Sequence, residues 1–84
     1  MAYFSKGLID RVYTDSDGVF IKLKNASPRP KDGYFRLLLT HSNYKSLYSL
    51  ILLAAAHRYP LNVRANSHIV STKHAEVGYL TVDW

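Results

Sequence analysis

Hydrophobic residues recur at two different spacings along the chain, and the longer spacing marks one helix among several strands. Residues 43–60, NYKSLYSLILLAAAHRYP, are dominated by Leu, Ala, Lys and Arg, which are good helix formers. Ser42 or Asn43 can cap the start of this helix, and Pro60 ends it. At about 100° per residue, one face of the helix collects Tyr44, Leu47, Tyr48, Ile51, Ala55 and Arg58. This face is predicted to pack on the core.

The opposite side of the helix is polar only in its first half, where residues such as Lys45 and Ser49 lie. In the second half this side is apolar. A helix that is apolar all round is covered on both sides. In a chain of 84 residues, we expect the second covering surface to be another subunit. The candidate oligomer interface is Leu52, Leu53 and Ala56.

Shorter segments on both sides of the helix alternate between apolar and polar residues, as strands do. The predicted strands are residues 7–13, 19–24, 34–40, 61–65 and 77–84. Turn residues at 14–18 and the proline-containing loop 25–33 separate the first three, and residues 66–76 fit either a strand or a loop. The residues expected to form the core together are Ile21, Leu37, Leu47, Ile51, Val63 and Leu80.

The order of these elements indicates the fold. Three strands, a helix and two strands, β-β-β-α-β-β, is the order of the OB-fold, a five-stranded Greek-key barrel. The main alternative is an open sheet with one covering helix. The barrel is preferred because it removes exposed strand edges and uses the helix to plug one end. The length predicts a single OB-fold-like domain over residues 1–84.

Positions in three of the predicted strands, together with the helix, carry a resemblance to a known family. The frame is Gly7-x-Ile9-Asp10, Ile21-Lys22, the helix rich in Leu, Ala and Tyr, and the strand around Val63. It resembles the pentameric B subunits of bacterial A–B toxins of the subtilase-cytotoxin and typhoid-toxin type. The resemblance implies an OB-fold, a ring of subunits with the helices lining a central pore, and glycan binding on the outer face. The chain has no cysteine and little sequence before the first predicted strand, so no sugar-binding residue is carried over.

Charge and aromatic content favour a binding protein. The formal net charge is +5, and seven residues are tyrosine. A small basic domain attracts nucleic acid, acidic proteins or anionic surfaces, and tyrosine suits interfaces. Cations and rings gather on the outward face of the second and third predicted strands. The candidate ligand-binding residues there are Phe20, Lys22, Lys24, Tyr34 and Arg36.

Three interpretations of this strand face stay open. OB-folds bind single-stranded nucleic acid there, with rings stacking on bases and cations following the phosphates. A subunit contact would also cover the rings, and a solvated face would use its cations to oppose aggregation. Arg11, Tyr13 and Arg64 extend the face if their strands point the same way.

No pattern in the sequence points to catalysis, a metal or a cofactor. The four histidines lack the spacing of zinc ligands. Asp15-x-Asp17-Gly18 begins like a calcium loop but has no glutamate at its far end. No glycine-rich phosphate loop is present. We therefore predict no catalytic residue, no metal site and no cofactor.

The predicted function is a non-catalytic OB-fold module that self-associates, into a ring resembling the toxin B pentamers, and binds a glycan or protein partner. The alternative is a single-stranded nucleic-acid-binding protein. The helix, which is the longest apolar run, is too short to span a bilayer, and no signal-peptide-length run is visible. We expect a cytoplasmic protein without membrane insertion, unless a secretion signal has been removed.

Overall fold

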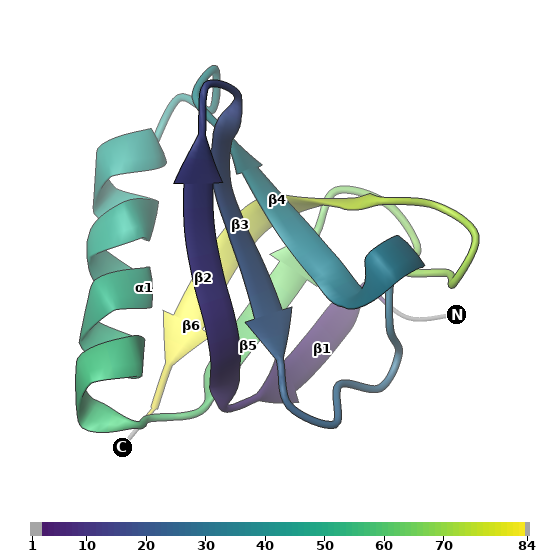
Figure 1. The fold of residues 1–84 in the computed structure, drawn as a ribbon, viewed down its shortest axis with the longest axis horizontal. Helices are drawn as coiled ribbons and strands as arrows, with labels where there is room; N and C mark the ends of the chain where they lie inside the picture. The colour runs from purple at the N-terminus through teal and green to yellow at the C-terminus, as the bar shows by residue number, and fades with distance from the viewer. Residues whose placement is uncertain (1–2, 84) are drawn as a thin grey trace.

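The structure is a computed structural model that describes residues 3–83, and within them it shows a mostly β domain with one α-helix (Figure 1). The elements are β1 (Phe4–Gly7), β2 (Ile9–Asp15), β3 (Gly18–Leu23), the 3-10 turn η1 (Lys31–Gly33), β4 (Tyr34–Leu38), α1 (Tyr44–His57), β5 (Leu61–Ala65) and β6 (Ala75–Val82). Figure 1 shows α1 running along one side of the strands.

The strands of the described chain form a six-stranded mixed sheet in the order β1-β5-β6-β4-β3-β2. Neighbouring strands are antiparallel except β4 and β6, which are parallel. The two edge strands, β1 and β2, are consecutive in the chain, with only Leu8 between them. At this junction the backbone N–H of Lys24 donates to the carbonyl oxygen of Leu8 at 2.8 Å.

The core lies between α1 and the sheet. The six residues that were expected to form the core together are all buried, with at most 7% of their surface exposed: Ile21, Leu37, Leu47, Ile51, Val63 and Leu80. Phe35 and Leu61 are fully buried with them. The alternation in the strands and the stripe on the helix therefore identified the apolar faces that pack together.

Strand boundaries differ from the prediction in several places, among them the last strand, which is Ala75–Val82 and not residues 77–84. The first predicted strand, residues 7–13, is divided at Leu8. The residues before Leu8 belong to β1, which begins at Phe4, and those after it belong to β2. β4 ends at Leu38 and not at residue 40, and Leu39 beyond its end is 51% exposed. β3 ends at Leu23, so Lys24 follows the strand instead of belonging to it.

The buried stripe of α1 lies slightly to one side of the predicted one. Ala54 is buried, whereas Ala55 and Arg58 are exposed, because the sheet meets the helix through Leu47, Ile51 and Ala54. Arg58 ends the helix in the left-handed conformation, with φ of 55°.

The start of α1 lacks the side-chain cap that Ser42 or Asn43 was expected to provide. Asn43 is the N-cap residue, but its side chain makes no capping hydrogen bond. Instead its backbone N–H donates to Nδ1 of His41 at 3.0 Å. Nε2 of His41 then donates to the carbonyl oxygen of Gly78, 2.9 Å away in β6. His41 therefore ties the start of the helix to the sheet.

The predicted fold class is confirmed in part. A mostly β domain with one helix is present in the described residues, and the helix follows the third strand of the β2–β3–β4 run. The closed five-stranded barrel is not confirmed, because the sheet has six strands and its two edges, β1 and β2, are not paired with each other.

Candidate ligand-binding face

The register between β3 and β4 brings most of the predicted face together. Phe20 lies opposite Arg36, and Lys22 lies opposite Tyr34. Directly opposed residues on one face of an antiparallel pair have side chains close enough to interact. Four of the five residues predicted from the alternation therefore form one surface patch.

The hairpin between β2 and β3 extends this patch. Tyr13 lies opposite Phe20, and Arg11 lies opposite Lys22. From the sequence, Arg11 and Tyr13 were expected on this face only if their side chains point to the same side of the sheet. The pattern of the first predicted strand did not decide which side that is. The aromatic–basic face, as we name it, consists of Arg11, Tyr13, Phe20, Lys22, Tyr34 and Arg36.

The rings of this face are stacked in a definite order. Tyr13 and Phe20 have ring centroids 4.8 Å apart with planes 10° from parallel, and Tyr13 and Tyr34 form a T-shaped pair with ring centroids 5.3 Å apart. Phe20 is only 9% exposed, whereas Tyr13 is 39% exposed. The expectation that Phe20 meets a ligand directly is therefore corrected: Tyr13 covers it, and Tyr13 offers the accessible ring.

The cations of the face lie beside these rings. The guanidinium carbon of Arg11 is 5.9 Å from the Tyr13 ring centroid, and Nζ of Lys22 is 5.9 Å from that of Tyr34. Nη2 of Arg36 pairs with Oε2 of Glu76 at 3.3 Å. Arg36 is thus partly neutralised, whereas Arg11 and Lys22 have no salt-bridge partner among residues 3–83.

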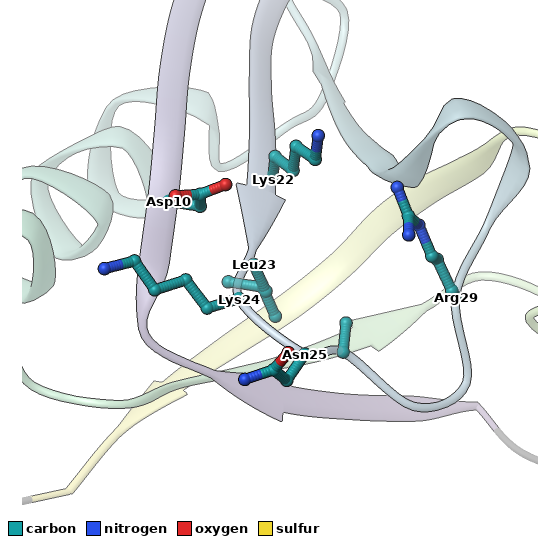
Figure 2. Close-up of a pocket in the computed structure, with 7 residues that line it drawn as sticks. Asp10, Lys22, Leu23, Lys24, Asn25 and Arg29 are labelled. Carbon is teal, nitrogen blue, oxygen red and sulfur yellow. The ribbon is translucent and has the colours of Figure 1, made fainter.

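Two pockets border the face. The larger, about 330 Å³, lies between the end of β3 and the loop that follows (Figure 2). Its lining, which we name the basic pocket, is Asp10, Lys22, Leu23, Lys24, Asn25, Ala26 and Arg29. The second, about 240 Å³, is named the mixed pocket and is lined by Tyr13, Asp15, Phe20, Asp32, Tyr34, Arg36 and His74. Lys22 belongs to the face and to the basic pocket.

Two of the cations considered from the sequence lie elsewhere. Lys24 extends away from Lys22 and Arg29, across β2, as Figure 2 shows. Arg64 lies in β5, where its guanidinium carbon is 4.4 Å from the ring centroid of Tyr3 and 5.3 Å from that of Phe4. Neither residue shares the surface formed by Tyr13 and Tyr34.

The candidate oligomer interface on α1 is open in the single chain. Leu52 is 50% exposed, Ala56 is exposed and Leu53 is half-buried. Ala55, which was expected to face the core, adds to this apolar side. The second half of the helix therefore presents apolar surface away from the sheet.

The histidines each have a local contact of their own. His41 bridges the helix start and Gly78, and His74 lies 3.3 Å from a carboxylate oxygen of Asp32. The ring centroid of His57 is 5.3 Å from that of Tyr59, and the ring centroid of His68 is 4.4 Å from that of Tyr3. Within residues 3–83, no three side chains of His, Cys, Asp or Glu gather as a metal site would require. No helix in the described part of the chain is long and apolar enough to cross a membrane.

No protein-family model, curated protein or solved structure matches this chain. Function is therefore inferred from the aromatic–basic face, the two pockets and the outer side of α1. Of these, the face combines exposed rings with unpaired cations, which is the surface chemistry of binding proteins.

Proposed function

We propose that this chain is a non-catalytic binding domain of the OB type, which self-associates and presents the aromatic–basic face to a ligand. The observation that carries the proposal is the meeting of Tyr13, Lys22 and Tyr34 on three adjacent strands. Phe20 stacks on one side of the Tyr13 ring, yet Tyr13 remains 39% exposed. Accessible rings of this kind suit each ligand class raised from the sequence, a glycan, a protein or single-stranded nucleic acid.

The connection between the two edge strands supports the OB-type barrel. If β1 and β2 are taken as one strand bent at Leu8, both edges of the sheet belong to that same strand. The strand order then becomes one-four-five-three-two-one, which returns to its start. The helix follows the third strand of this count, as in the OB-fold. In OB-folds the ligand surface includes the second and third strands, which are β3 and β4 here.

The outer side of α1 supports self-association with a second copy of the chain as the partner. Leu52, Leu53 and Ala56 form an apolar surface on a domain of only 84 residues, and small domains gain stability by burying such surface in an assembly. The resemblance to toxin B subunits supports a ring, with the helices of neighbouring copies in contact. The ligand surface, on β2, β3 and β4, then stays accessible.

Replacing Leu52 with glutamate is expected to dissociate the assembly. Burying an unpaired carboxylate at a subunit contact costs several kcal/mol. Leu52 is 50% exposed in the single chain, so the monomer should still fold. Leu53 is less suitable because it is half-buried within its own subunit. Light scattering should give a multiple of the chain mass for wild type and the mass of one chain for Leu52→Glu.

Ser46→Glu is the matched control for this experiment. It introduces the same charge at an exposed polar position in the first half of α1 and should leave the assembly intact. An assembly that tolerates Leu52→Glu as well as Ser46→Glu would place the subunit contact somewhere other than the outer side of α1.

A further inference from the structure

The two pockets beside the aromatic–basic face differ in their charge. The mixed pocket holds Arg36, which pairs with Glu76, and Asp32, which lies 3.3 Å from His74. Asp15 adds a second carboxylate to it. Because Arg36 is paired with Glu76, the two aspartates leave this pocket without an excess of positive charge, and an anionic group gains little there.

The basic pocket has an excess of positive charge. Lys22, Lys24 and Arg29 line it, against one carboxylate from Asp10. Within residues 3–83, none of the three cations forms a salt bridge, and none donates a side-chain hydrogen bond to a protein acceptor. Figure 2 shows Lys22 and Arg29 extending toward the same end of the pocket. Two unpaired cations at one end of a pocket are suited to an anionic group of a ligand.

Gly33 leaves space for the guanidinium of Arg29 in the basic pocket. A Cβ atom built on Gly33 would lie 2.9 Å from both Nε and Nη2 of Arg29, so the guanidinium lies directly against the glycine. The next residue in the chain is Tyr34, whose ring centroid is 5.9 Å from Nζ of Lys22. Lys22 therefore stands beside Tyr34, where the pocket meets the face, and Arg29 lies against Gly33 on the same pocket.

We propose that the aromatic–basic face and the basic pocket together bind single-stranded nucleic acid. A phosphate lies between Lys22 and Arg29, and a neighbouring base stacks on Tyr13, above Phe20. The inference rests on the proposed function, because it names the ligand class for the same face. Stacking on exposed rings and cations that follow the phosphates are the two features that such sites combine.

Other ligand classes use only part of this surface. A neutral glycan packs on rings but leaves Lys22 and Arg29 without a counter-charge. An acidic peptide supplies carboxylates but has no need of the stacked pair of Tyr13 and Phe20. In a duplex the bases are already stacked on one another, so a duplex can meet the cations but cannot place a base on Tyr13. A single strand satisfies the rings and the cations together.

The test is fluorescence anisotropy with a labelled mixed-sequence oligonucleotide of about 15 nucleotides, as single-stranded DNA and as RNA. Wild-type protein is expected to bind, and its affinity should fall steeply between about 50 and 200 mM salt as counterion release becomes less favourable. Lys22→Ala and Arg29→Ala should each flatten the plot of log affinity against log salt by roughly one unit. Tyr13→Ala should weaken binding by about 5- to 150-fold.

Lys45→Ala is the matched control, because it removes one positive charge from an exposed position on α1, away from the face. It should leave the salt slope and the affinity unchanged. Circular dichroism on each variant checks that the fold is retained.

The proposal is overturned if no oligonucleotide binds at about 50 mM salt, or if Lys45→Ala weakens binding as much as Lys22→Ala. It is also overturned if the duplex or polyglutamate competes as well as the single strand, since the surface would then bind polyanions in general. Light scattering separates these failures from failure of the proposed function. A protein that self-associates but binds no oligonucleotide removes only the nucleic-acid inference.

Discussion

Ile51→Ala is expected to lower the free energy of unfolding by about 2–5 kcal/mol. Ile51 is fully buried in the middle of α1, between Leu47 and Ala54 on the stripe that meets the sheet. The truncation deletes three methyl or methylene groups that are packed in the core. It leaves a cavity that the closely packed sheet cannot fill. For a domain of this size, such a loss is a large fraction of the total stability.

Urea unfolding followed by circular dichroism measures the effect, and Leu39→Ala is the matched control. Leu39 is 51% exposed and lies beyond the end of β4, so its truncation should change the free energy by less than about 0.5 kcal/mol. Equal losses from the two truncations would mean that the helix does not pack on the sheet through Ile51.

Gly18→Ala is expected to destabilise the fold by at least about 2 kcal/mol. Gly18 begins β3 with φ of 153°, a backbone conformation that residues with a side chain rarely adopt. A Cβ atom there would overlap the carbonyl oxygen of Leu37 in β4. Because that oxygen belongs to the backbone of a central strand, the strands themselves must separate to make room.

Thermal unfolding compares this change with Asp17→Ala in the same turn. Asp17 is exposed, and its contribution to the turn is its backbone N–H, which donates to Oδ1 of Asp15 at 2.8 Å. Alanine retains that donor, so the melting temperature should change little. If Gly18→Ala were equally mild, the close approach of β3 and β4 at this turn would be wrong.

The core could be predicted from the sequence because burial leaves a periodic signal. Val63 shows the two-residue alternation of a half-buried strand, and β5 has the predicted bounds. Leu47 and Ile51 lie four residues apart on a helix and reach the same surface. In both cases the local pattern and the tertiary packing require the same residues.

The edge strand β1 could not be predicted in this way. Its four residues, FSKG, are too few to show alternation, and its partner β5 lies far along the chain. Its one buried polar residue, Ser5, is explained by a tertiary contact: its hydroxyl donates to the carbonyl oxygen of Pro28 at 2.9 Å. Such long-range pairing leaves no mark on a short segment.

The candidate site was predicted in part for a related reason. The alternation in β3 and β4 fixed the direction of Lys22, Tyr34 and Arg36, and the register then placed them together. It could not rank the rings by exposure, because the covering of Phe20 by Tyr13 depends on the hairpin register and on side-chain rotamers. Arg29 was missed as a site residue because its position depends on the loop and on Gly33.

The central claim is that the chain assembles through α1 while the aromatic–basic face stays free for a ligand. Light scattering on purified wild type and Tyr13→Ala, over a range of concentrations, tests it most directly. The account predicts one and the same multiple of the chain mass for both proteins, since Tyr13 lies outside the subunit contact. A wild-type protein that stays a single chain at every concentration, or an assembly that Tyr13→Ala dissociates, would contradict it.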